Sequence, residues 1–370
     1  MNERDSQIKD FAVTAARPEI RTLQPYDAGS APAGVRLCAN ENDLPPSAKV
    51  REAIIKAAGN INRYPESSSY ELRCRLAERY GPAAEQIVTG NGLDGIFTMI
   101  GRAFLSRGDT VLHGALTFSV YESTARIMGA EPISVPMTGD LALDVDSFIS
   151  SVTPETKLIC FCNPNNPTGS MAKRADIMRL LDTVPQHVLV LLDEAYIEFS
   201  DRDEESALNL LNRYRNLLVC RTFSKIHGLA GLRIGWLAAD KELTAQLYKV
   251  REPYCVTEIA AAAAAAALDD SSYYENSKRV FTKERRRLEA FFKKQEIDFF
   301  PTEANFFLLP EHRLPIFELL SAAGITARKI EFAAQRYTRL SIGTAIENSR
   351  VMAALTKALA CQPSRVKANI

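Results

Sequence analysis

Short apolar segments alternate with helical patterns through the middle of this 370-residue chain, and this alternation restricts the fold more than any other feature. The segments with strand character are near-continuous runs of Val, Leu, Ile and Cys, as in 157–162, 187–193 and 217–222. Strands that are apolar throughout are covered on both faces, and their alternation with helices favours a mostly parallel sheet. We therefore predict an α/β protein whose central sheet lies between two layers of helices.

The chain is expected to form two domains and an N-terminal arm. Residues 1–47 are irregular and rich in Pro, Asn and Asp, and should form the arm and part of the smaller domain. Residues 48–258 should form the large domain, with a mostly parallel mixed sheet of seven strands. Residues 259–370 should form the smaller α+β domain, in which the highly charged helix 272–295 is expected to lie largely in solvent. The seven strands are predicted at 86–89, 110–113, 132–136, 157–162, 187–193, 217–222 and 233–238.

Charge and composition exclude several classes of protein. Lys+Arg and Asp+Glu balance at 45 each, so no overall basic field is available to attract nucleic acid or an anionic membrane. The longest apolar run, Ile259–Leu268, is far shorter than the roughly 20 residues that span a bilayer. The seven cysteines form no C-x-x-C pair, so we expect free thiols and no metal site. We predict a cytoplasmic protein without a nucleic-acid or membrane partner.

The segment Gly90–Asp94 (G-N-G-L-D) joins a predicted strand to a predicted helix. Its two glycines allow a tight turn, and the amides of Leu93 and Asp94 would lie at the positive end of the helix dipole, where phosphate binds well. Taken alone, the segment also fits a plain glycine turn capped by Asp94. Its spacing matches neither G-x-G-x-x-G nor the P-loop, which argues against both nucleotide-binding motifs.

Three further segments place polar groups at the ends of predicted strands, where open α/β sheets bind ligands. Asn163–Gly169 (N-P-N-N-P-T-G) is a rigid turn that can present an amide. Asp193 ends the most apolar strand and needs a cationic partner, and Tyr196 follows at the same rim. Lys225 is either a solvated lysine or an amine of lowered pKa that can form an imine. A phosphate site, an amide, a buried carboxylate and a reactive lysine are together what a Schiff-base cofactor with a pyridinium nitrogen needs.

From about residue 20 to residue 359 the chain resembles the fold-type I pyridoxal-phosphate (PLP) aminotransferases of class I/II, and within them the histidinol-phosphate aminotransferases. The fold type is indicated by N-P-T-G (166–169), D-E-A-Y (193–196), S-K (224–225) and G-L-R-I-G (231–235). The subfamily is indicated by L-x-P-Y (23–26), N-E-N (40–42), R-Y-P (63–65), G-N-G-x-D (90–94) and A-N-F (304–306). The resemblance implies ping-pong transfer of an amino group between an anionic amine, with L-histidinol phosphate as the best match, and 2-oxoglutarate.

The resemblance also implies a role for individual residues. Lys225 would form the imine with PLP and move the substrate proton, Asp193 would pair with the ring nitrogen, and Tyr196 would hydrogen-bond the phenolic oxygen; these three are the expected catalytic residues. Further cofactor contacts are implied for Gly92, Leu93, Asp94, Phe118, Asn166, Ser224, Arg233 and Tyr64, the last reaching the PLP of the other subunit of a homodimer. Substrate contacts are implied for Tyr26, Asn42, Arg328 and Arg339.

The chain departs from the family pattern at four places, all at the expected rim of the site. Leu93 stands where Ser is usual, Asp43-Leu44 replaces Pro-Tyr, His113–Leu116 replaces a proline-rich entry, and Ala345 stands where Arg is common. These departures leave the cofactor positions intact and bear on the substrate. Two alternatives therefore stay open: an aminotransferase for aromatic or other amino acids, and a decarboxylase similar to threonine-phosphate decarboxylase.

Overall fold

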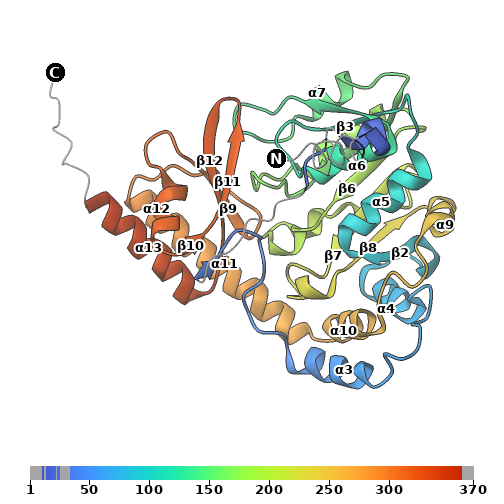
Figure 1. The fold of residues 1–370 in the computed structure, drawn as a ribbon, viewed down its shortest axis with the longest axis horizontal. Coiled ribbons are helices and arrows are strands. Elements are labelled where there is room, and N and C mark those ends of the chain that lie inside the picture. The colour runs from blue at the N-terminus through green and yellow to red at the C-terminus, as the bar shows by residue number, and fades with distance from the viewer. Residues whose placement is uncertain (1–10, 12–13, 22, 26–33, 361–370) are drawn as a thin grey trace.

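A seven-stranded sheet forms the centre of the molecule (Figure 1). The computed structural model describes residues 11, 14–21, 23–25 and 34–360. The strand order is β2-β8-β7-β6-β5-β3-β4; β8 is antiparallel to both of its neighbours, and the remaining pairs are parallel. The predicted mostly parallel mixed sheet is thus confirmed. Its strands are β2 (Ile87–Asn91), β3 (Thr110–Gly114), β4 (Glu131–Val135), β5 (Thr156–Cys162), β6 (Leu189–Asp193), β7 (Leu217–Thr222) and β8 (Ile234–Ala239).

Helices cover both faces of this sheet. Alternate residues of its strands point to opposite sides, so each face contributes to a different apolar cluster. In β6, Leu189 and Leu191 belong to one apolar cluster, and Val190 and Leu192 belong to another. The first cluster includes residues of α5 (Gly92–Phe104), α6 (Val120–Met128) and α9 (Lys241–Val250). The second includes residues of α3 (Ala48–Ala58), α4 (Tyr70–Tyr80), α7 (Val145–Ser150), α8 (Arg174–Thr183) and α10 (Glu258–Leu268). The continuous apolar character of the strands follows from this double cover.

A smaller α+β unit follows in the chain. Its sheet has the order β11-β12-β9 and is antiparallel, while β1 and β10 form a separate parallel pair. Val35 and Arg36, near the end of the N-terminal arm, pair with Ile325 and Thr326, so this part of the arm adds a strand to the unit. The elements are β1 (Val35–Arg36), α11 (Ser271–Lys294), β9 (Phe306–Pro310), α12 (Ile316–Ala322), β10 (Ile325–Thr326), β11 (Arg328–Phe332), β12 (Gln335–Ser341) and α13 (Ala345–Ala360).

Short helical segments complete the described chain. Helix α2 (Pro18–Arg21) lies in the N-terminal arm and contacts α6. The 3-10 helices are η1 (Ala84–Gln86), η2 (Ile197–Phe199), η3 (Asp203–Glu205), η4 (Ala207–Leu210) and η5 (Ala230–Leu232).

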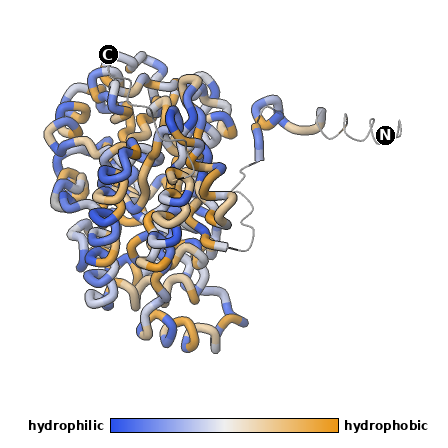
Figure 2. Tube along the Cα trace, turned by 90° about the vertical axis from the view of Figure 1, so that its left-hand side faces the viewer, coloured by the Kyte–Doolittle hydropathy of each residue, from blue (hydrophilic) through white to orange (hydrophobic). Residues whose placement is uncertain are grey.

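Two helices after the predicted domain boundary differ from what the sequence predicts, one in the unit with which it packs and the other in its burial. Ala260, Ala263 and other alanines of α10 share an apolar cluster with the large sheet, so α10 packs with the large unit although it follows residue 258. The boundary itself stays a prediction. Helix α11 is not largely in solvent: Phe281, Leu288 and Phe292 recur at helical spacing and are buried, together with the charged residues Glu284 and Arg285. Figure 2 shows hydrophilic and hydrophobic colours alternating along the outer helices.

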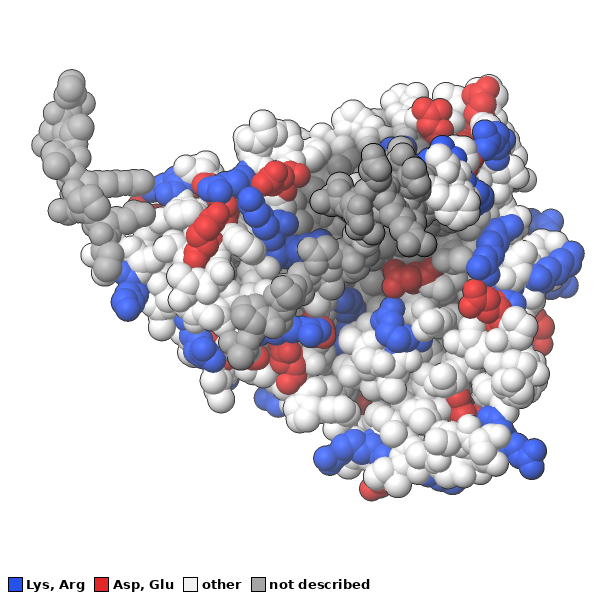
Figure 3. All heavy atoms as spheres, viewed as in Figure 1, with Lys and Arg blue, Asp and Glu red and all other residues white. Residues whose placement is uncertain are grey.

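The surface carries charges of both signs. On the face seen in Figure 3, Lys and Arg side chains are interspersed with Asp and Glu, in keeping with the zero net charge of the chain. Within the described residues, no helix is both long enough and apolar enough to cross a membrane. The same part of the chain contains no group of three or more His, Cys, Asp or Glu side chains that could hold a metal ion. Cys160 and Cys162 are buried free thiols, as predicted.

Candidate active site

The sheet topology brings the predicted cofactor residues to one edge. Strands β2, β5, β6 and β7 run in the same direction, so Gly92, Asn163, Asp193 and the loop after Thr222 all follow carboxyl ends at this edge. Because β8 is antiparallel, the residue that precedes it, Arg233, returns to the same edge. Residues separated by more than a hundred positions in the sequence thus meet where a parallel sheet normally binds its ligand.

Lys225 lies in the loop that follows β7. Its Nζ donates a hydrogen bond to the carbonyl oxygen of Ala39 at 3.0 Å and lies 5.5 Å from the centre of the Tyr196 ring. Burial, followed by the positive charge of Arg339, lowers the pKa of Lys225 to about 8. Much more of this amine is therefore neutral near neutral pH than in a solvated lysine, as an imine-forming lysine requires.

Asp193 ends β6 as a buried carboxylate. Its Oδ2 accepts a hydrogen bond from the Tyr121 hydroxyl at 2.6 Å, and its Oδ1 accepts one from the Ala195 amide at 3.0 Å. Burial raises the pKa of Asp193 to about 6, against the lowering effect of these donors. No ion pair joins it to a Lys or Arg among the described residues, so the cationic partner expected from the sequence is not a protein side chain. A protonated pyridine nitrogen fits this position.

Tyr196, Asn166 and Arg339 form the next layer of the site. The Tyr196 oxygen accepts a hydrogen bond from Asn40 Nδ2 at 3.1 Å, and burial raises the pKa of Tyr196, so the phenol stays protonated. Arg339 donates from Nη1 to Asn166 Oδ1 at 2.6 Å and from Nη2 to the carbonyl oxygen of Cys38 at 2.6 Å. The guanidinium therefore lies against the amide that is expected to contact the cofactor.

The N-terminus of α5 suits the phosphate of the cofactor. The side chain of the N-cap residue Asn91 makes no capping hydrogen bond, so the first amides of this helix are open to a ligand. Gly92 has a φ of +67°, and a Cβ atom there would lie 2.5 Å from Arg233 Nη2, so only glycine lets the guanidinium come so close. Arg233 is paired with Asp94 at 3.0 Å. The amide of Ser224 donates to Thr222 Oγ1 at 3.0 Å, which fixes the start of the lysine loop.

The expected aromatic contacts lie in two different places. Phe118, just before α6, packs edge-on against Phe97 and Tyr121, with ring centres 6.4 and 5.8 Å away. Tyr64 is 81% exposed in the single chain and stacks on Tyr254, with ring centres 4.5 Å apart. Exposure of a large aromatic ring is what a contact with a second subunit would explain.

The substrate residues expected from the sequence do not all lie together. Arg328 and Arg339 are directly opposite each other in the β11–β12 ladder, so both side chains leave the same face of that sheet. Asn42 has its side chain turned to the chain beyond Lys225, where Nδ2 donates to the carbonyl oxygen of Ile226 at 2.9 Å. Tyr26 lies outside the described residues.

Sequence reasoning missed two polar partners of the site. Asn40 belongs to the N-E-N segment but was given no role, and it contacts Tyr196 from 156 positions away. Tyr121 follows Phe118 by three positions, so the two face the same side of the helix start. That spacing is a signal that could have found Tyr121; the N-E-N segment marks Asn40, but nothing in it indicates which group the side chain contacts.

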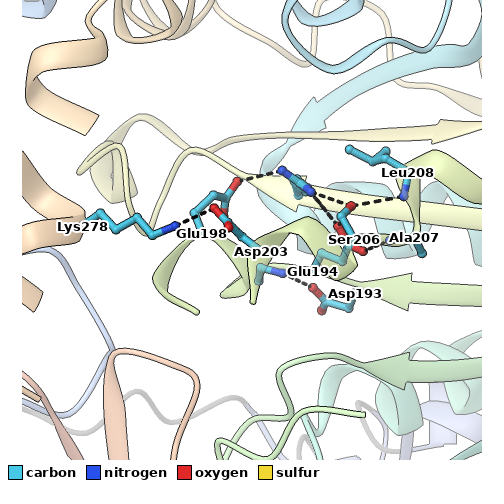
Figure 4. A network of polar contacts seen from close by, with 10 residues as sticks. Asp193, Glu194, Glu198, Asp203, Ser206, Ala207, Leu208 and Lys278 are labelled. Carbon is cyan, nitrogen blue, oxygen red and sulfur yellow. Dashed lines mark hydrogen bonds and ion pairs between the residues drawn. The ribbon is translucent and has the colours of Figure 1, made fainter. Parts of the chain in front are cut away.

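A buried ion-pair network lies behind Asp193, on the opposite face of the sheet (Figure 4). Arg221 of β7 donates to Glu194 Oε2 from Nε at 3.0 Å and from Nη2 at 2.9 Å, and from Nη1 to Glu198 Oε1 at 3.4 Å. Ser206 donates from Oγ to Glu194 Oε2 at 2.8 Å. Because Glu194 follows Asp193, this network joins the chain that carries the carboxylate to the strand that leads to Lys225.

The residues at this edge fit PLP. They offer a lysine of lowered pKa, a buried carboxylate without a protein cation, a phenol and an amide, and an uncapped helix N-terminus beside an arginine. Together with the mixed seven-stranded sheet, these groups define a PLP-dependent enzyme of fold type I.

Comparison with known proteins agrees with this class. The sequence model of the family described as Aminotransferase class I and II matches residues 32–355. A protein named histidinol-phosphate aminotransferase 2 from Methylococcus capsulatus is 35% identical over 366 residues, which cover 94% of this chain and 98% of the relative. A protein named aromatic amino acid aminotransferase from Mycolicibacterium vanbaalenii is 38% identical over 296 residues, or 80% of this chain and 84% of the relative.

A solved structure gives the same result. The crystal structure of histidinol-phosphate aminotransferase from Sinorhizobium meliloti in complex with pyridoxal-5'-phosphate has a TM-score of 0.88 and 26% identity, and covers 94% of this chain and 98% of its own. The chain belongs to the class I and II aminotransferase family. It is a PLP-dependent transaminase.

Proposed function

We propose that this transaminase exchanges the amino group of L-histidinol phosphate with 2-oxoglutarate. The observation that carries the proposal is the pair Arg328 and Arg339, which face each other across two strands. Two cations directly opposite each other repel, so an anion between them is favourable. The geometry of a guanidinium group suits both carboxylate and phosphate, and one site can thus accept both an amino-alcohol phosphate and a dicarboxylate. The name of the 35% identical relative favours histidinol phosphate.

The catalytic residues act on a proton and on the cofactor ring. PLP, when bound, supplies a carbonyl carbon for the amine and a pyridinium ring that withdraws electrons. The neutral Nζ of Lys225 removes the proton from Cα of the substrate and later returns a proton, a transfer that contributes about 10²–10⁴-fold to the rate. The Asp193 carboxylate holds the proton on the ring nitrogen. Tyr196 and Asn166 orient the phenolic oxygen.

The remaining residues hold the cofactor and the substrate. The amides of Gly92, Leu93 and Asp94, together with Ser224 and Arg233, would bind the phosphate of PLP, and Phe118 would stack on its ring. Arg328 and Arg339 would bind the substrate anion, and Tyr26 and Asn42 are retained as substrate contacts. The cytoplasmic location predicted from the sequence is also part of this proposal.

A homodimer is part of the proposed site. Tyr64 would reach the phosphate of PLP in the partner subunit, and other exposed apolar residues lie shortly before it in the sequence. Ile55 and Ile61 are 73% and 68% exposed, although isoleucine is among the residues most often buried. An isologous two-fold contact would cover these side chains on both subunits.

An aminotransferase for aromatic amino acids is the second candidate. The relative from Mycolicibacterium vanbaalenii bears that name at 38% identity, although over a shorter part of the chain. An aromatic amino acid would leave the two arginines with a carboxylate as their only anion, whereas histidinol phosphate offers a phosphate.

A single-turnover experiment tests the proposal. The purified chain loaded with PLP is mixed with histidinol phosphate, phenylalanine or glutamate, and the loss of the absorbance of the bound cofactor is followed. Histidinol phosphate and glutamate should react, and phenylalanine should react at least tenfold more slowly. Faster reaction with phenylalanine would establish the second candidate, and release of carbon dioxide without a keto product would indicate a decarboxylase. Lys225→Ala should abolish turnover, and retention of most activity would overturn the assignment.

A further inference from the structure

Asn40 links the N-terminal arm to both halves of the site. It is 1% exposed and has a φ of +54°, a left-handed conformation that Asn tolerates better than most residues. Its amide N donates to Ser341 Oγ at 2.9 Å, and its carbonyl oxygen accepts from Asn305 Nδ2 at 3.1 Å. Its Nδ2 donates to the Tyr196 oxygen at 3.1 Å. The residue therefore joins the arm, two segments of the small unit and the phenol of the large unit.

The hydroxyl of Ser341 fixes which way the Asn40 amide points. Ser341 is 1% exposed, and its Oγ accepts from the Asn40 main chain while it lies 3.0 Å from Asn40 Oδ1. Its proton needs an acceptor, because a buried hydroxyl without one is costly. Among the described residues, Asn40 Oδ1 is the acceptor that the hydrogen bonds provide. With Oδ1 used in this way, Nδ2 must be the atom that faces Tyr196.

The direction of the last hydrogen bond determines what Tyr196 can do. Asn40 donates to the Tyr196 oxygen, so the Tyr196 hydroxyl does not donate to Asn40. The hydroxyl proton can therefore be donated to a different acceptor. The Tyr196 ring is held independently, since it packs edge-on against Phe306 with ring centres 5.1 Å apart. Asn40 therefore determines the direction of the hydroxyl, while packing determines the position of the ring.

We propose that Asn40 is a positioning residue that makes Tyr196 a hydrogen-bond donor to the phenolic oxygen of PLP. The inference rests on the proposed role of Tyr196. The hydrogen bonds run from Ser341 to Asn40 and from Asn40 to Tyr196. Ser341 lies two positions after Arg339 on β12, the strand that carries a proposed substrate arginine. The same strand thus supports the substrate anion and the donor to the cofactor.

Asn40→Asp tests the direction of the hydrogen bond at nearly constant shape. A carboxylate would accept hydrogen bonds from both Ser341 and Tyr196. The Tyr196 hydroxyl would then donate to this carboxylate and no longer to the cofactor. A donor to the phenolic oxygen favours its anion, and its loss should raise the pKa at which the absorbance of bound PLP titrates by roughly one unit. Asn40→Ala, which removes the amide altogether, should raise the same pKa by a smaller amount and covers the case in which the new carboxyl group becomes protonated.

Each variant is also made in a Tyr196→Phe background. If Asn40 acts through the hydroxyl, the shift caused by either substitution should fall to less than half in that background. Equal shifts in both backgrounds, or no shift in the Tyr196 protein, would overturn the inference. Asn216→Asp is the matched control: Asn216 is buried and donates to the carbonyl oxygen of Val188 at 2.8 Å, at the opposite edge of the sheet. It should leave the titration unchanged.

The titration requires no substrate. A chain that forms the PLP chromophore and titrates as expected, yet fails to react with histidinol phosphate, would contradict the proposed substrate and not the role of Asn40. A chain that transaminates histidinol phosphate normally but shows no change in Asn40→Asp and Asn40→Ala would contradict only the role of Asn40.

Discussion

Arg339 influences Lys225 by its charge as well as by its position near the site. After burial, its positive charge is the largest cause that lowers the pKa of Lys225 to about 8. Arg339→Gln keeps a donor for Asn166 and removes this charge, so the pKa of Lys225 should rise. We expect the rate of PLP uptake by the apo-chain, which needs the neutral amine, to reach its plateau at a higher pH. Arg328→Gln is the control, because Arg328 is not among the causes of the shift; equal profiles for wild type and Arg339→Gln would refute the coupling.

The stability of the apo-chain should depend on Asp193 in the opposite sense to most carboxylates. Its pKa is about 6 in the folded chain against an ordinary value of 3.8, so the folded state binds more protons between these values, and stability falls as pH rises through this window. The stability of Asp193→Asn relative to wild type should therefore increase by about 1–3 kcal/mol between pH 4 and pH 7.

Urea denaturation of the apo-proteins at the two pH values measures this difference. Tyr121→Phe is the companion variant, because the Tyr121 hydrogen bond lowers the pKa of Asp193 and its loss should extend the window above pH 6. A relative stability that does not change with pH would mean that Asp193 is ionised at the same pH in the folded and unfolded chains.

At the residue scale, sequence reasoning reaches what local motifs carry. Asp193 and Lys225 each lie next to the carboxyl end of a predicted strand, where open α/β sheets bind ligands, whereas the role of Arg233 follows only from the resemblance. Asn40 and Asn42 show what sequence reasoning cannot predict. Two positions apart, one faces the catalytic phenol and the other faces the carbonyl oxygen of Ile226. The difference follows from the left-handed backbone at Asn40 and from contacts with distant segments, which no short sequence pattern encodes.

At the scale of elements, length and periodicity decide what is predictable. The strand 217–222 has the predicted bounds, because a long apolar run marks it. The strands β1 and β10 have two residues each, too few for any period, and they exist only because they pair with each other. The prediction that α11 lies largely in solvent was based on its charge and is wrong. Its buried face includes Glu284 and Arg285, whose side chains are paired with Asn348 and Asp201.

Removing the cation of the buried network around Arg221 should be strongly destabilising, because it leaves buried carboxylates without a partner. Arg221→Met would leave the carboxylates of Glu194 and Glu198 buried without their cation, and this should cost about 3–5 kcal/mol. The pKa of Glu198 is already raised to about 7 by burial, so its proton uptake can offset part of the loss at low pH.

Chemical denaturation of Arg221→Met at pH 8 measures the cost. Adding Glu194→Gln removes one of the uncompensated charges, so the double variant should be more stable than Arg221→Met alone. If the double variant were less stable by the sum of the two single effects, the pair would not interact as the structure indicates.

At the scale of the whole molecule, the single chain holds all but one of the proposed cofactor residues at one edge of its sheet. Tyr64 is the exception, because it is 81% exposed in the described chain and stacks only on Tyr254. If Tyr64 contacts PLP in the partner subunit, each active site contains Lys225 from one subunit and Tyr64 from the other. Two inactive variants can then restore one complete site when they share a dimer.

Mixing Lys225→Ala with Tyr64→Ala tests this arrangement. Each variant alone should have little activity, the first for lack of the amine and the second through weaker PLP binding. After unfolding and refolding together in equal amounts, a hybrid dimer has one site with both Lys225 and Tyr64 intact, so activity should recover to about a quarter of the wild-type value. The mass of the complex in solution gives the independent measurement of two chains. Recovery would fail if Tyr64 acted within its own subunit, because every site of the hybrid would then lack one of the two residues.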